Sequence, residues 1–188
     1  MKLCGLLLCL LVTPLAYASK TVLPDACGNN DVKFDVKAID DHTQPLTPDD
    51  GKALLVFVEE NTALGTDATI RYGLDGKWAG ATHGSQYFLV QVAPGEHHIC
   101  ASMQAKFGMG SPEHYVGTAS VTAEAGKVYY YGAVVGVQAT GSGTAFVNGS
   151  MATVQQNKKV AVQYSLMSED DGKYRVKAGK LAQATPSQ

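Results

Sequence analysis

Apolar and polar residues alternate along most of the chain after residue 31, in short runs separated by turn residues. A period of two places successive side chains on opposite faces, so each run predicts a half-buried strand. One run, residues 53–58, is apolar throughout and predicts a strand that is buried on both faces. The other predicted strands are 32–39, 68–74, 77–81, 86–92, 97–104, 116–122, 127–137 and 159–167.

Turn signals separate these runs. The dipeptide Asp75-Gly76 is the strongest of them and predicts a two-residue hairpin turn. Residues 124–126 predict a second hairpin, which would join the strands on either side of them. Residues 138–153 are rich in Gly, Ser and Thr and predict a loop.

One short helix is predicted near the C-terminus. Ser168 can cap it, acidic residues follow at once and basic residues come later, which suits the helix dipole. Gly179 can end it. Residues 181–188 are expected to form a disordered tail.

Together these elements predict an all-β fold, an antiparallel β-sandwich of about eight or nine strands with one short C-terminal helix. Residues 32–180 would form its single domain. The predicted core takes one or two apolar residues from each strand: Phe34, Val56, Phe57, Ile70, Phe88, Val90, Ile99, Val121, Val134, Val162 and Tyr164.

Residues 1–18 have the pattern of an export signal. Lys2 gives a positive start, residues 3–15 are apolar, and the small residues Ala16 and Ala18 precede a cleavage site. The apolar run is shorter than the ~20 residues of a membrane-spanning helix. The mature chain is therefore expected to lie in the periplasm or outside the cell, without a transmembrane span.

Cleavage near Ala18 leaves two of the four cysteines, Cys27 and Cys100. An even pair in an exported protein predicts a disulfide. Cys27 lies in an N-terminal arm, residues 19–31, so the bond would fasten this arm to a strand in the middle of the domain. Lipid attachment at Cys9 is disfavoured, because leucines precede it where a lipoprotein signal has small residues.

The composition excludes several classes of function. Charged residues make up 17% of the chain and the net charge is -2, so there is no basic patch for nucleic acid. Dinucleotide-binding, phosphate-loop and nucleophile-elbow motifs are absent from the sequence, and no cofactor is predicted.

The histidines give the only candidate for metal or acid–base chemistry. His97 and His98 are neighbours on a predicted strand, so they face opposite sides and cannot bind one metal together. Zinc takes three or four ligands, and no metal site is predicted. A small exported hydrolase or metal-binding protein that uses His97 or His98 is the alternative function.

Three aromatic residues are candidates for a binding surface. Trp78 follows the predicted hairpin turn, and Tyr129 and Tyr131 share one face of a strand while Tyr130 takes the other. Large amphipathic rings on an open sheet face can bind sugars or proteins. The alternative is that these rings pack in the core or along its edge.

Several segments in order resemble an exported bacterial family, domain of unknown function 2846. They are Asp75-Gly76-Lys77-Trp78-Ala79-Gly80, Tyr87-Phe88, Pro94-Gly95-Glu96-His97-His98-Ile99-Cys100, Glu124-Ala125-Gly126-Lys127-Val128-Tyr129-Tyr130 and Asp171-Gly172-Lys173-Tyr174. A looser resemblance is to surface modules of the PEGA type. Both resemblances imply an immunoglobulin-like or transthyretin-like sandwich, and neither implies a reaction.

The sequence thus favours an exported, non-catalytic β-sandwich module with a binding or structural role at the cell envelope. Its expected partner is an envelope protein or a polysaccharide.

Overall fold

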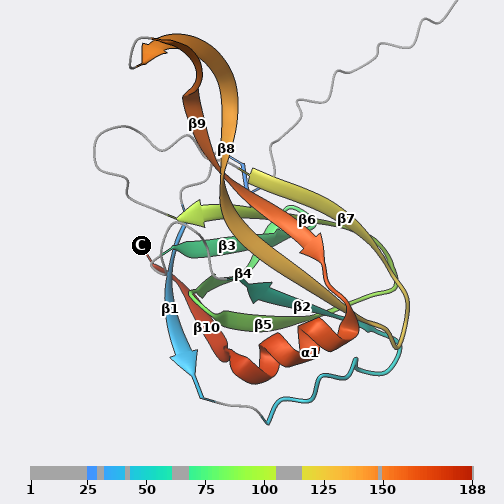
Figure 1. The fold of residues 1–188 in the computed structure, drawn as a ribbon. Helices are drawn as coiled ribbons and strands as arrows, with labels where there is room; N and C mark the ends of the chain where they lie inside the picture. The colour runs from blue at the N-terminus through green and yellow to red at the C-terminus, as the bar shows by residue number, and fades with distance from the viewer. Residues whose placement is uncertain are drawn as a thin grey trace, which may run out of the picture.

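The computed structural model describes residues 25–28, 32–40, 43–60, 68–104, 116–147 and 150–187, with the backbone alone for 135–161. The expected signal peptide, residues 1–18, lies outside these ranges. Within these ranges the chain forms two packed sheets and one helix, which confirms the all-β sandwich (Figure 1). The elements are β1 (Lys33–Ile39), β2 (Ala53–Glu59), β3 (Thr69–Leu74), β4 (Lys77–His83), β5 (Gln86–Val92), β6 (Gly95–Gln104), β7 (Val116–Ala123), β8 (Val128–Val147), β9 (Ser150–Leu166), α1 (Glu169–Ala178) and β10 (Lys180–Ser187).

The sequence predicts a sandwich that is antiparallel throughout, but two pairs of neighbouring strands run parallel. One sheet has six strands in the order β1-β10-β5-β2-β8-β9, and the other has four in the order β4-β3-β6-β7. In the larger sheet β8 runs parallel to β2, and β10 runs parallel to β5. The described residues thus form ten strands. The larger sheet is mixed, because β8 and β10 pair in parallel with strands that are distant in the sequence.

The predicted turn at Asp75-Gly76 is confirmed. Both residues have positive φ angles, 49° for Asp75 and 79° for Gly76, and they connect β3 to its antiparallel neighbour β4. Two positive φ angles give the turn a twist that matches the strands beside it. The second predicted hairpin is wrong: β7 pairs with β6, whereas β8 pairs with β2, so residues 124–126 carry the chain from one sheet to the other.

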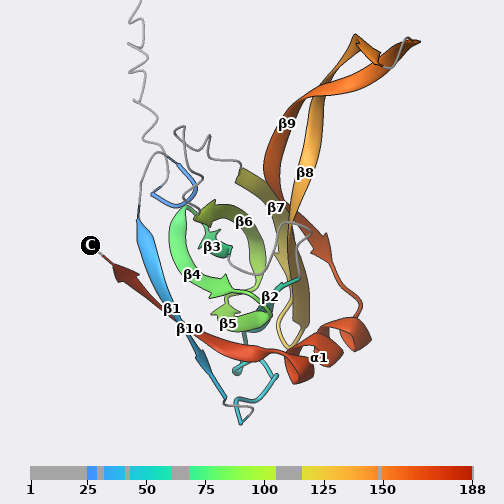
Figure 2. The same cartoon turned by 60° about the vertical axis from the view of Figure 1, so that its left-hand side comes forward.

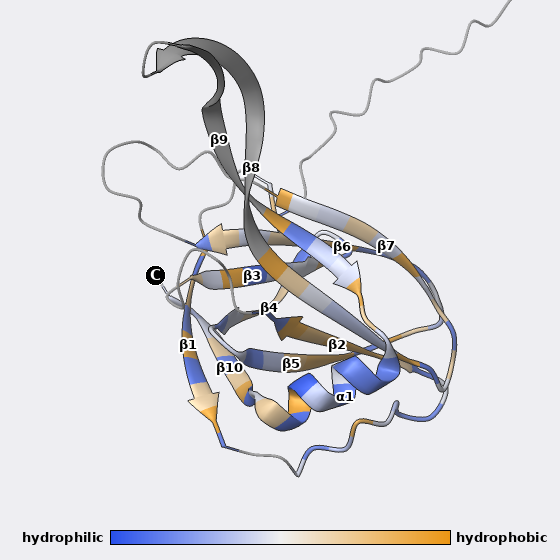
Figure 3. Ribbon diagram, in the orientation of Figure 1, coloured by the Kyte–Doolittle hydropathy of each residue, from blue (hydrophilic) through white to orange (hydrophobic). Residues whose placement is uncertain are grey.

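The main core lies between the two sheets. β2 is buried along its whole length and is coloured as hydrophobic in Figure 3. Ala53, Leu55 and Phe57 face the smaller sheet, and the residues between them face α1. At the centre, the ring centroid of Phe57 lies 4.9 Å from that of Phe88 and 5.2 Å from that of Tyr72.

The structure buries eight of the residues predicted for the core: Phe34, Val56, Phe57, Ile70, Phe88, Ile99, Val121 and Val162. Val90 and Tyr164 are partly buried and pack against this core. Val134 is half-buried.

The predicted helix is confirmed as α1, and the N-cap is the expected one. The Ser168 hydroxyl accepts a hydrogen bond from the Asp171 backbone N–H at 3.2 Å, and Gly179 follows the last turn. α1 covers the outer face of the six-stranded sheet (Figure 1). Across the described ranges, no helix has the length and apolar character needed to cross a membrane.

The prediction of a disordered tail is wrong. Residues 181–187 belong to β10, which lies inside the larger sheet between β1 and β5. β10 pairs with β1 along its length, from Ile39↔Leu181 to Lys33↔Ser187. The polar, small residues of this segment lack a strong strand pattern, so its partner strand decides its structure.

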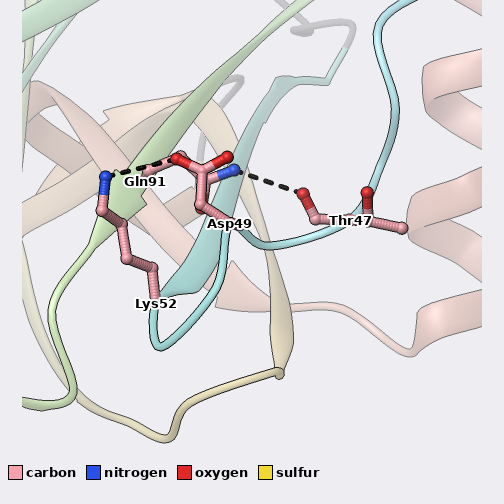
Figure 4. Close-up of polar contacts among 4 residues, drawn as sticks. All are labelled: Thr47, Asp49, Lys52 and Gln91. Carbon is pink, nitrogen blue, oxygen red and sulfur yellow. Dashed lines mark hydrogen bonds and ion pairs between the residues drawn. The ribbon is translucent and has the colours of Figure 1, made fainter.

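The segment before β2 is held to the sheet by polar contacts (Figure 4). The Gln91 amide donates to the Thr47 carbonyl at 3.2 Å and accepts from the Asp49 N–H at 3.1 Å. Lys52 Nζ lies 3.2 Å from Asp49 Oδ2. Leu46 packs against the apolar cluster beneath α1, so this segment covers part of the outer face of the sheet.

The predicted loop at 138–153 is also wrong where the structure describes it. β8 and β9 pair from Tyr131↔Leu166 to Val147↔Ser150, with irregular register between Ala139 and Ser142. The two strands continue beyond the sandwich as a two-stranded extension (Figures 1 and 2). We call residues 138–147 and 150–159 of this extension the ribbon.

Candidate functional site

His97 and Asp75 form an ion pair beside the β3–β4 turn. His97 Nδ1 lies 2.6 Å from Asp75 Oδ2, and His97 Nε2 lies 2.7 Å from the Ala93 carbonyl oxygen. The second carboxylate oxygen of Asp75 accepts from the His98 backbone N–H at 2.9 Å. The pair therefore ties the turn after β3 to the segment before β6.

The chemistry of these partners favours the protonated form of His97. A carboxylate and a carbonyl oxygen both accept hydrogen bonds, so both contacts are satisfied when both ring nitrogens donate, as they do in the charged imidazole. The hydrogen bonds to Asp75 and Ala93 raise the pKa of His97. Partial burial acts to raise the pKa of Asp75, but the bonds from His97 and His98 outweigh it and lower that pKa. Because both nitrogens have partners, His97 links the β3–β4 turn to Ala93 and is not placed as a general base.

Of the described histidines, neither His83 nor His98 completes a site with His97, while His42 and His114 lie outside the described residues. His98 is exposed, and His83 Nδ1 lies 3.1 Å from the Thr69 hydroxyl. Within the described ranges, no group of three or more His, Cys, Asp or Glu side chains is placed to hold a metal ion.

Cys27 and Cys100 are joined by a disulfide, as predicted, with Cα atoms 6.3 Å apart. The bond holds residues 25–28 against the outer face of the smaller sheet, where the Ala26 N–H also donates to the Gly76 carbonyl at 3.0 Å. Gly73 makes this approach possible, because a Cβ there would lie 2.6 Å from the Cys100 sulfur.

A shallow hollow of about 470 Å³ lies beside this disulfide. His98 and Thr118 lie on its border, together with Val116, whose side chain is 36% exposed. No charged cluster faces it among the described residues, so its lining does not specify a ligand class.

Trp78 is not an open platform. Its ring meets the Phe34 ring edge-on with centroids 6.0 Å apart, and the Arg71 guanidinium carbon lies 5.0 Å from its centroid. Arg71 is 4% exposed and donates to the Val32 carbonyl at 2.6 Å. Trp78 thus fastens β1 and the residues before it to the smaller sheet, and it is half-buried.

The two tyrosines of the proposed binding surface share one face, as predicted, but that face is the interior. Tyr131 is 5% exposed and packs between the sheets with Phe57. The Tyr129 hydroxyl accepts from the Glu124 N–H at 3.1 Å and donates to the Thr122 carbonyl at 3.2 Å. Tyr129 therefore holds the crossing between β7 and β8, and the expectation of an exposed Tyr131 is wrong.

The sequence reading missed a buried carboxyl group. Glu59 ends β2 on the same face as Phe57 and is 5% exposed. Thr82 donates to Glu59 Oε2 at 2.6 Å, and the Tyr72 hydroxyl lies 3.0 Å from the Thr82 hydroxyl. Burial raises the pKa of Glu59 to about 7, although hydrogen bonds from Thr82 and Gly84 oppose the shift. The sequence offered one signal of this burial, because Glu59 directly follows the apolar run at residues 53–58.

The ribbon is the second feature that the sequence reading missed. It contains no Asp or Glu, and its only charged residues are Lys158 and Lys159 at its base. An isolated pair of strands is marginally stable in water, because it leaves both of its edges unpaired. Of the surfaces described here, the ribbon is therefore the one whose backbone is best suited to receive another molecule.

In comparisons with known proteins, no protein-family model matches the chain and no curated protein matches it. The resemblance to domain of unknown function 2846 and to PEGA-type modules stays a prediction from the motifs.

Proposed function

We propose that this protein is an exported, non-catalytic β-sandwich module that acts in the periplasm or outside the cell. In this proposal the sandwich is a scaffold and the ribbon is its contact surface for a protein of the envelope. The single observation that carries the proposal is the extension of β8 and β9 beyond the sheets as a two-stranded ribbon whose only charged residues are at its base.

The chemistry of the ribbon favours a protein partner that supplies a strand. Backbone N–H and C=O groups along a free edge pair readily with another extended chain, and such pairing gives affinity without a pocket. A polysaccharide partner instead requires exposed aromatic rings. Of the three rings predicted for such a surface, Trp78 and Tyr131 are committed to the packing of the sandwich and Tyr129 to the crossing between β7 and β8, while the exposed Tyr174 stands on α1.

The predicted export signal and the disulfide support the proposed location. Disulfides persist in oxidising compartments, and Cys27–Cys100 closes a separation of 73 residues. The alternative, a hydrolase or metal-binding protein that uses His97 or His98, has less support because both nitrogens of His97 already have partners.

A capture experiment tests the proposal. The mature protein is immobilised and exposed to an envelope extract and, separately, to purified peptidoglycan. The comparison variant replaces residues 138–159 by Asn-Gly, because Val137 and Val160 are paired and a two-residue turn can join them.

We expect the full-length protein to retain an envelope protein that the shortened variant loses, while both melt at nearly the same temperature. Equal retention by both variants would reject the ribbon as the contact surface. If the protein retained only peptidoglycan, the proposed partner would be a polysaccharide and not a protein.

A further inference from the structure

We propose that the ribbon pairs edge to edge with the ribbon of a second copy of this chain, through β9, to form a symmetric dimer. The inference rests on the proposed function, in which the ribbon is the contact surface, and it names the partner.

Some edges of the two sheets are covered by other strands, and some are not. The edge strands are β1 and β9 in the larger sheet and β4 and β7 in the smaller one. β4 lies against β10, and β7 lies against the base of β9. Gly117 on β7 comes so close to β9 that a Cβ there would overlap the Val162 carbonyl oxygen. Three segments are thus protected by contacts within the sandwich: β4, β7 and the base of β9.

The edges that remain are β1 and the two edges of the ribbon, and they differ in charge. β1 exposes Lys33, Asp35 and Lys37, and charged side chains on an edge strand oppose pairing with another chain. In contrast, residues 150–157 of β9 are eight successive positions without a charge or a proline. In the described part of the chain, β8 is the only strand paired with β9. Among the described residues, the edge formed by β9 in the ribbon therefore lacks the charges of β1 and the covering contacts of β4 and β7, and its irregularity in register lies opposite residues 139–142.

A strand suits this edge better than a lipid surface. Hydrocarbon cannot satisfy the N–H and C=O groups of an open edge, so an unpaired ribbon is excluded from the membrane interior. The edge of a second ribbon supplies donors and acceptors at the same spacing.

Self-pairing also avoids charge repulsion. An isologous dimer has a two-fold axis, so β9 would run antiparallel to its counterpart. With the axis at Thr153, residues 150–156 of the two copies would pair, and Lys158 of each copy would lie beyond the paired segment. The two Lys158 positions would then be ten residues apart, about 34 Å at the rise of a β-strand. That separation is far beyond the ~10 Å screening length at moderate salt.

The oligomeric state tests the inference. Sedimentation of the mature protein over a wide range of concentrations should give the mass of two chains, falling to one chain on dilution. Thr153→Lys with Gln155→Lys places two positive charges at the pairing centre and should give a monomer throughout. The matched control is Gln183→Lys with Thr185→Lys, the same two exchanges on exposed positions of β10, and it should remain dimeric.

A second measurement locates the contact. Thr153→Cys should form a disulfide between two chains on mild oxidation, because position 153 lies at the proposed axis. Three results would overturn the inference: a wild-type protein that is monomeric at every concentration, a ribbon variant that dimerises as well as wild type, or a control variant that also dissociates. A monomer that still captures an envelope protein through its ribbon would overturn self-pairing and leave the proposed function in place.

Discussion

Gly172 of α1 lies directly on the ring of Tyr130 in β8, and a Cβ at position 172 would overlap three carbon atoms of that tyrosine. Both residues are buried. Glycine normally weakens a helix, so its presence in α1 reflects the close approach of the helix to the sheet. The contact joins the C-terminal helix to the strand that continues into the ribbon.

Replacing Gly172 by Ala should destabilise the protein. Alanine favours a helix over glycine by about 1 kcal/mol, but forcing a methyl group into a packed contact costs up to about 3 kcal/mol. We therefore expect a net loss of about 2 kcal/mol in the free energy of unfolding, measured by chemical denaturation. In a Tyr130→Leu background the same change should cost less, because the ring that it overlaps is gone. An equal cost in both backgrounds would contradict the contact.

The buried carboxyl of Glu59 should make stability fall as pH rises. Its pKa is raised from the usual 4.5 to about 7, so the folded protein holds this proton more tightly than the unfolded chain. Stability from this group is complete below about pH 4.5 and is lost as pH rises through 7. Each pKa unit is worth about 1.4 kcal/mol, so the full loss for a shift from 4.5 to about 7 is roughly 3.5 kcal/mol.

Glu59→Gln should remove this loss and unfold at higher denaturant than wild type at pH 8. The neighbouring Glu60→Gln is the control, because Glu60 is only partly buried and faces Arg175 at 3.7 Å. Denaturation curves at pH 5 and pH 8 give the comparison. If Glu59→Gln keeps the same fall between these two values, another group is responsible.

The ion pair of His97 with Asp75 should add a second pH dependence. The raised pKa of His97 gives stability that is present below its ordinary range and is lost as pH rises through the raised value. The lowered pKa of Asp75 gives stability that is present above its ordinary value and is lost as pH falls through the lowered one. The pair therefore contributes most at mildly acidic pH.

Asp75→Asn isolates the charge, because asparagine also tolerates the positive φ angle of this turn. We expect a loss of about 1 kcal/mol near pH 6, small because the carboxylate is half exposed, and a smaller loss in alkali. An NMR titration of the His97 ring should show its pKa falling towards the ordinary value in this variant. An unchanged titration would mean that the bond to Ala93 alone holds the proton.

The disulfide should be essential for stability. The mature chain without reductant should show no reactive thiol, either native or denatured. A closed segment of this length is worth about 4 kcal/mol in the chain-entropy model, so Cys27→Ala with Cys100→Ala should lower the free energy of unfolding by that order. Two titratable thiols per chain would contradict the bond.

The features that local chemistry controls were predictable from the sequence. Asp75-Gly76 forms the expected turn because both residues accept positive φ angles. Ser168 caps the expected helix because its hydroxyl reaches the N–H three residues on. Residues 53–58 are buried on both faces because no polar side chain interrupts them. These interactions join residues close in the chain, so their pattern is visible in the sequence.

The placement of the aromatic residues was only half predictable. The period of two correctly put Tyr129 and Tyr131 on one face and Tyr130 on the other. Which face points inward depends on the position of the second sheet, and the alternation does not contain that information. Tyr131 therefore belongs to the core, and the binding surface predicted from it does not exist as a set of exposed rings.

By itself, the sequence determined most of the strands within the sandwich, the helix with its cap, the hairpin turn and the cysteine pairing, because each follows from local geometry or from a count. Only the tertiary structure decided that residues 181–187 form a strand inside a sheet, that β7 and β8 belong to different sheets and that Glu59 is buried. It also decided that residues 138–147 and 150–159 continue as strands. Each of these strands pairs with a backbone partner that is distant in sequence or lies on the other strand of the same hairpin, and composition alone does not identify that partner. Glu59 is buried because the smaller sheet, with Thr82, covers the end of β2.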